Sequence, residues 1–113
     1  MAEKRNLKRR ELLYNLRVQD DETGELIGYA VDINAQGLRF TSSQDFKPGQ
    51  RLELSLDLPH EILGKRSVKL IGEVKWCSPD INPELRAAGV HFSSVTPDNE
   101  EALVALMAQF SFV

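Results

Sequence analysis

The chain has 113 residues, a length that suits one domain with a modest hydrophobic core. Its 42% hydrophobic and 27% charged residues indicate a globular protein rather than a disordered one, and its single cysteine excludes an intrachain disulfide. No apolar run approaches the roughly 18 residues of a membrane helix. The charged N-terminus also lacks the apolar core of a signal peptide. We therefore expect a cytoplasmic protein that does not enter a membrane.

The formal net charge of −3 conceals an uneven distribution of charge along the chain. Five of the 14 basic residues precede Glu11, and only Glu3 offsets them there. The rest of the chain has 9 basic against 16 acidic residues, a net charge of −7. This asymmetry predicts a flexible basic arm over residues 1–10, a domain over residues 11–113, and a local anion site. It disfavours nucleic acid as a partner, because nucleic acid needs basic residues spread over one face.

Alternation of apolar and polar residues predicts six short strands. The pattern covers residues 12–18, 27–33, 38–40, 51–58, 68–76 and 88–92. The alternation is clearest at 51–58, where every second residue is leucine. In the second strand we expect one shared apolar face, formed by Ile27, Tyr29, Val31 and Ile33. Turn residues occupy 20–24 and 47–50, and residues 59–66, which contain Pro59, are interpreted as a loop.

Only the end of the chain changes period. Thr96 is suited to cap a helix, Pro97 fits its first turn, and acidic residues follow where the helix dipole favours them. A helically spaced apolar stripe then predicts a helix over residues 97–110: Leu103, Leu106, Met107 and Phe110. Six strands followed by one helix predict an all-β fold, a six-stranded antiparallel β-barrel with a C-terminal helix packed on it.

Two arginines, Arg5 and Arg9, stand four residues apart in the basic arm. Guanidinium groups bind phosphate in a bidentate manner and stack on purine rings, so the pair is a candidate anion site. Taken alone, this spacing is more typical of a solvated basic tail.

A second candidate site is the segment from Asp32 to Gly37. Ile33 belongs to the apolar face, so Asp32 and Asn34 are expected to project from the opposite face. A carboxylate accepts hydrogen bonds from the guanine N1–H and amino groups, an amide both donates and accepts, and glycine allows a sharp turn close to a ligand. An ordinary strand end followed by a loop is the simpler interpretation of this segment alone.

Together the two segments resemble the two-part signature of the PilZ domain family, R-x-x-x-R followed by [D/N]-x-S-x-x-G. The matching residues are Arg5 and Arg9, then Asp32, Asn34 and Gly37. The resemblance extends over nearly the whole chain, through the segments 47–50, 73–76 and 88–92 to the final helix.

The resemblance implies a six-stranded barrel that binds cyclic di-GMP, a bacterial second messenger, and that signals to a protein partner. By this likeness Arg5 and Arg9 would contact phosphates and guanine faces, and Arg10 would assist. Asp32 would bind a guanine edge, Asn34 would replace the motif serine, and Gly37 would shape the loop. Because Asn34 departs from the motif, a protein-interaction module that does not bind the nucleotide stays open as an alternative.

The remaining polar and aromatic residues point to no enzyme and no bound cofactor. The chain has no histidine, cysteine and carboxylate cluster with metal-site spacing, and Cys77 is interpreted as a structural thiol without a neighbouring base. Trp76 is expected in the core, and His91 on the surface because it alternates with apolar neighbours. Arg39 is expected on the outer face, where a surface role is favoured over an extension of the anion site.

Overall fold

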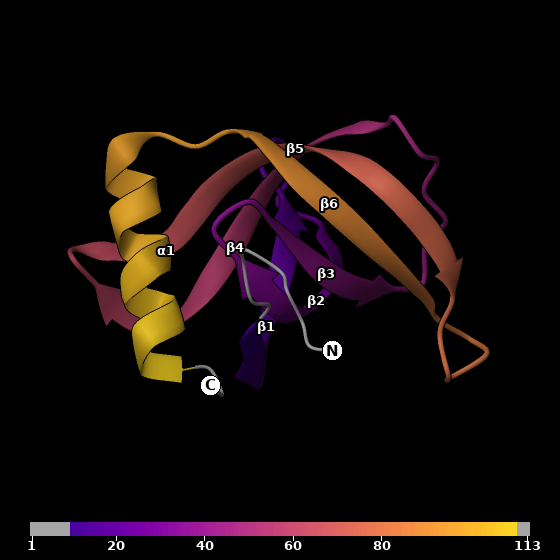
Figure 1. Ribbon diagram of the computed structural model, residues 1–113, viewed down its shortest axis with the longest axis horizontal. Coiled ribbons are helices and arrows are strands. Elements are labelled where there is room, and N and C mark those ends of the chain that lie inside the picture. The colour runs from indigo at the N-terminus through magenta and orange to yellow at the C-terminus, as the bar shows by residue number, and fades with distance from the viewer. Residues whose placement is uncertain (1–9, 111–113) are drawn as a thin grey trace, which may run out of the picture.

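A computed structural model describes residues 10–110 and shows a closed barrel of six strands with one helix (Figure 1). Every neighbouring pair of strands is antiparallel, in the order β1-β2-β3-β6-β5-β4, and β1 pairs with β4 to close the barrel. This confirms the predicted fold class. The elements are β1 (Arg10–Asp20), β2 (Leu26–Asn34), β3 (Gly37–Ser42), β4 (Arg51–Ile62), β5 (Lys65–Pro79), β6 (Arg86–Ser94) and α1 (Pro97–Phe110). Within the described range, no helix is long and apolar enough to cross a membrane.

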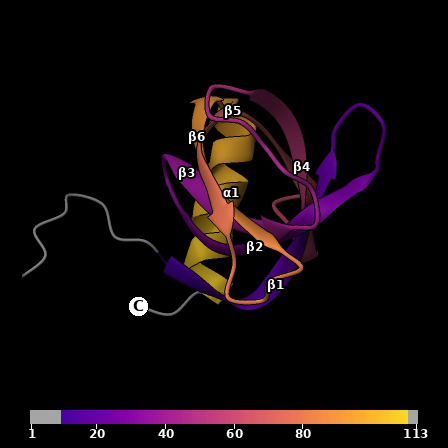
Figure 2. The same cartoon turned by 90° about the vertical axis from the view of Figure 1, so that its right-hand side faces the viewer.

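The core fills the barrel and continues under the helix. β4 shows the expected alternation, with Leu52, Leu54 and Leu56 buried and the residues between them partly exposed. The helix packs against β5, β1 and β4, and its buried face is formed by Ala102, Leu103 and Leu106. Figure 1 shows the helix at one end of the barrel and the turn between β5 and β6 at the other, and in Figure 2 the helix stands behind the strands.

The helix starts as the sequence predicts and is tied to the barrel at that end. The Thr96 hydroxyl donates to Asp98 Oδ1 at 2.6 Å, and Asp98 Oδ2 pairs with Lys65 Nζ at 2.9 Å. Asn99 is buried, donates to Thr96 Oγ1 and accepts from the backbone N–H of Lys69 on β5. These bonds link the first turn of α1 to the start of β5.

The prediction of a loop at residues 59–66 is wrong, because these residues form the end of a long β4–β5 hairpin. β4 continues to Ile62, and β5 begins at Lys65, its direct partner. Leu63 and Gly64 both have positive φ, 51° and 80°. A two-residue hairpin turn requires this conformation to match the twist of its strands. Pro59 is tolerated because it lies within a register irregularity, where the strand needs no regular N–H donor.

A β-bulge in β2 contradicts the expected single apolar face of that strand. Ala30 pairs with Phe40 and Asp32 pairs with Arg39, so Val31 is the extra residue. Ile33 is buried, whereas Tyr29 is 40% exposed. The bulge reverses the phase of the strand after Ala30, and this places Asp32 opposite the outward-facing Arg39.

Candidate functional site

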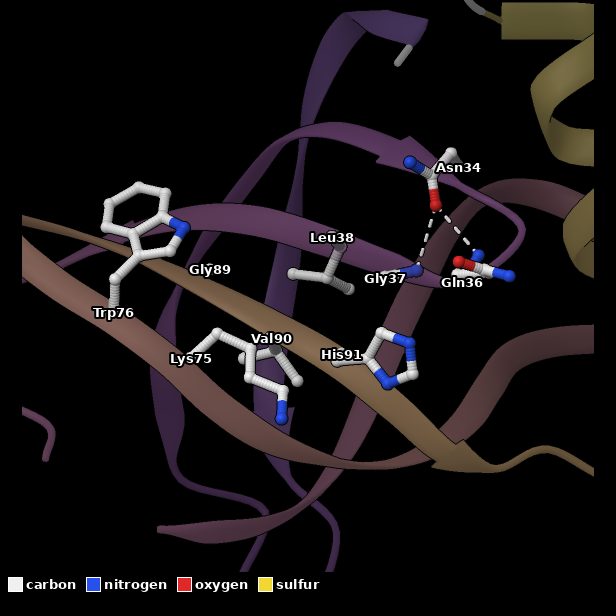
Figure 3. A pocket seen from close by; sticks show the side chains of 9 residues that line it. All are labelled: Asn34, Gln36, Gly37, Leu38, Lys75, Trp76, Gly89, Val90 and His91. Carbon is white, nitrogen blue, oxygen red and sulfur yellow. Dashed lines mark hydrogen bonds between the residues drawn. The ribbon is translucent and has the colours of Figure 1, made fainter. Parts of the chain in front are cut away.

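The turn between β2 and β3 is held by the side chain of Asn34 (Figure 3). Its carbonyl Oδ1 accepts hydrogen bonds from the backbone N–H of Gln36 at 2.7 Å and of Gly37 at 3.0 Å. This is an Asx-type turn, in which a side chain replaces a backbone acceptor. Asn34 therefore shapes the turn through its oxygen, which the sequence pattern alone does not reveal.

Gly37 is required for a different reason from the one expected. It has no positive φ, but a Cβ at this position would lie 2.2 Å from the carbonyl oxygen of Val90. Gly37 therefore permits a close approach of β3 to β6, and no sharp backbone turn depends on it.

Asp32 is a buried carboxylate on the outward side of β2. Its side chain is only 4% exposed, and its Oδ2 pairs with a terminal nitrogen of Arg39 at 2.9 Å. Arg39 is 41% exposed, yet its Nε is buried and has no hydrogen-bond partner among the described residues. The contact therefore uses one end of the guanidinium and leaves Nε unsatisfied.

The start of β1 brings the N-terminal segment to this same end of the barrel. Arg10 pairs with Ile33, and Glu11 pairs with Asp32. Arg5 and Arg9 lie outside the described residues, and the side chain of Arg10 is not described. The chain nevertheless enters the barrel directly beside the segment from Asp32 to Gly37.

A shallow depression of about 190 Å³ lies on the outer face beside this turn. It is lined by Asn34, Gln36, Gly37, Leu38, Lys75, Trp76, Gly89, Val90 and His91. Figure 3 shows the Trp76 indole at one end and Asn34 and His91 at the other. The depression therefore runs across β3, β6 and β5, and two glycines, Gly37 and Gly89, belong to its lining.

The prediction that Trp76 lies in the core is wrong, since the side chain is 37% exposed. Val74 pairs with Val90 and Trp76 pairs with Gly89, so Lys75 is an extra residue that turns Trp76 outward. A Cβ on Gly89 would lie only 2.3 Å from the indole Nε1, which shows that the ring lies over the bare backbone of β6. Trp76 and Lys75 are thus site residues that the sequence reasoning missed. His91 is exposed, as expected.

Four paired positions form one row across the outer face of the barrel. Asp32 on β2 pairs with Arg39 on β3, Arg39 with Gly89 on β6, and Gly89 with Trp76 on β5. From β2 to β5 the row therefore carries a carboxylate, a guanidinium, a glycine without a side chain and an aromatic ring. These groups supply hydrogen-bond acceptors, donors and a stacking surface of the kind that a nucleotide base needs.

A model of the PilZ domain matches residues 3–109 of the chain. The chain belongs to the PilZ domain family. PilZ domains are generally non-catalytic and typically bind cyclic di-GMP. No curated protein matches the chain.

Solved structures of PilZ proteins share the fold of this PilZ domain. The inhibitor of motility MotI/DgrA from Bacillus subtilis matches with a TM-score of 0.71 at 20% identity, over 96% of this chain and 51% of that one. This chain thus spans about half the length of that protein. The PilZ domain of YcgR from Escherichia coli, solved with c-di-GMP, matches with a TM-score of 0.68 at 12% identity, over 94% and 90% of the two chains. A tetrameric PilZ protein from Xanthomonas campestris matches with a TM-score of 0.55 at 15% identity, over 79% and 49%.

The described part of this PilZ domain contains no group of three histidine, cysteine or acidic side chains that could hold a metal ion. Cys77 is partly buried against the core, and its thiol lies 3.6 Å from Asp45 Oδ1.

Proposed function

We propose that this PilZ domain binds cyclic di-GMP on the outer face of β2, β3, β6 and β5. One observation carries the proposal: β1 begins beside Asp32, so the segment with Arg5 and Arg9 joins the barrel next to the second half of the signature. The family and the ligand-bound YcgR domain, which has the same fold, support the choice of ligand.

Each signature residue has a proposed role in this complex. Arg5 and Arg9 contact the phosphates and guanine faces, with assistance from Arg10. Asp32 accepts hydrogen bonds from a guanine edge, while Asn34 and Gly37 maintain the turn and the close strand pairing beneath the ligand. Trp76 supplies an aromatic face and Lys75 a further cation at the other end of the depression.

The test is a titration of purified protein with cyclic di-GMP by calorimetry and by fluorescence. Trp76 is the only tryptophan of the chain, so its emission reports on this site alone. We expect saturable binding that changes the emission. Arg9→Ala or Asp32→Asn should weaken binding by roughly tenfold or more, since each removes a charge-assisted hydrogen bond.

The matched control is Arg51→Gln, which removes an arginine paired with Glu53 on β4 and outside the lining of the depression. It should leave the affinity unchanged. A flat titration of the unaltered protein would contradict the proposal and favour the alternative, an interaction module that does not bind the nucleotide. The observation that favours this alternative is Asn34, which stands in place of the motif serine and whose oxygen is engaged in the turn.

We propose further that binding alters the surface around the site and that a protein partner responds to the change. Hydrogen exchange with and without cyclic di-GMP measures this directly. Added protection confined to the ligand contacts would contradict the adapter role, whereas changes that reach the neighbouring surface would support it.

A further inference from the structure

The bulge at Val31 places Asp32 and Arg39 directly opposite one another on the outer face of the barrel. Without the extra residue, Asp32 would share the inward side of Ala30, which is fully buried in the core. A bulge that redirects one side chain is typical of a functional position. The pairing of this carboxylate with this guanidinium is therefore built into the strand register.

Burial makes the orientation of Asp32 decisive for any ligand. With 4% of its side chain exposed, the carboxylate offers a base edge only a narrow direction of approach. Oδ2 is held by Arg39 at 2.9 Å, and this charge-assisted contact restrains the rotation of the carboxylate. A small rotation of this group would turn its acceptors away from a bound base.

The other neighbour of Arg39 offers no competing acceptor side chain. Across β6 its partner is Gly89, which is covered by the Trp76 indole. The guanidinium is thus directed to Asp32, although its buried Nε stays unpaired. A buried donor without a partner calls for an explanation, and a guanidinium oriented towards Asp32 supplies one.

We infer that Arg39 is a positioning residue, which sets the guanine selectivity of the site by holding the Asp32 carboxylate in place. This inference rests on the proposed function. Guanine presents N1–H and a 2-amino group to such a carboxylate, whereas hypoxanthine keeps N1–H and lacks the amino group. The affinity ratio of cyclic di-GMP to cyclic di-IMP therefore reports on the geometry of Asp32.

The experiment measures this ratio by calorimetry for the unaltered protein and for Arg39→Gln, Asp32→Asn and the double variant. We expect the unaltered protein to prefer cyclic di-GMP by roughly tenfold or more, the worth of a hydrogen bond to a charged group. Arg39→Gln should bring the ratio close to one. In the Asp32→Asn background, Arg39→Gln should not change the affinity ratio further, because the two residues act as a unit.

Two results would overturn the inference while the proposed function stands. One is an unchanged ratio in Arg39→Gln, and the other is an equal loss of affinity for both dinucleotides, which indicates direct phosphate binding. Arg39→Lys, which keeps the charge beside Asp32, serves where Arg39→Gln does not fold. In Arg39→Lys, a reduced ratio of the two affinities supports positioning by the planar guanidinium, and an unchanged ratio contradicts it. Failure of the unaltered protein to bind either dinucleotide contradicts the proposed function itself.

Discussion

The indole ring of Trp76 lies directly over Gly89, its partner across the β5–β6 ladder. A Cβ at position 89 would lie 2.3 Å from Nε1 and 2.6 Å from Cε2 of the ring, and the three nearest atoms all belong to Trp76. The glycine therefore leaves room for the indole against the strand, beside Arg39 in the same row.

Gly89→Ala should displace the indole and destabilise the protein by about 1 kcal/mol, since the added methyl group overpacks this contact. The emission of the single tryptophan should shift to longer wavelength as the ring moves into water. Urea unfolding and fluorescence spectra measure the two effects.

The control for this prediction is the same substitution in a Trp76→Ala background. Because the three nearest atoms all belong to the indole, Gly89→Ala should then cost little stability. An equal cost in both backgrounds would show that the glycine serves the backbone of β6 instead.

Asn34 offers a second prediction, on the turn that borders the site. Asn34→Ala removes the acceptor for the N–H groups of Gln36 and Gly37, and should destabilise the protein by about 1 kcal/mol. Asn34→Ser restores the motif residue, whose hydroxyl can accept a similar but weaker bond, and should fall between the two. Thermal melting of the three proteins tests this order, and equal midpoints for Asn34→Ala and the unaltered protein would contradict it.

The six strands of the barrel could be predicted because apolar alternation persists wherever the ladder is regular, as in the leucines of β4. The helix could be predicted because its apolar residues follow helical spacing after Thr96 and Pro97. The bulges at Val31 and Lys75 could not be predicted, because an extra residue leaves no mark in the composition of a strand. The exposure of Trp76 depends on the second bulge, whereas the side of Asp32 opposite the buried Ile33 is expected from the sequence. The Trp76–Gly89 contact is likewise visible only once the register across two strands is known.

Asp98 predicts an acid-dependent contribution to stability. The hydrogen bond from Thr96, followed by that from Lys65, holds the pKa of this carboxyl well below its usual value of 3.8. A pKa lowered by folding means that the stabilisation is present above 3.8 and is lost as the pH falls below it. The stability difference between the unaltered protein and Asp98→Asn should therefore shrink from about pH 6 to about pH 2 in urea unfolding.

Lys65→Gln provides the matched comparison for Asp98. It removes the second cause of the lowered pKa and leaves the Thr96 hydrogen bond, so the acid-dependent contribution should persist in reduced form. A difference between the unaltered protein and Asp98→Asn that does not vary with pH would rule out this contribution.

Leu63 carries the last prediction, because it is the one described non-glycine residue with positive φ. The left-handed conformation costs a side chain such as leucine about 1 kcal/mol or more, whereas asparagine adopts it readily in two-residue hairpin turns. Since 66% of Leu63 is exposed, little burial is lost on replacement. Leu63→Asn should therefore stabilise the protein by about 1 kcal/mol in urea unfolding. Leu63→Ala keeps the backbone strain and should give no such gain, so equal stability of the two variants would contradict this explanation.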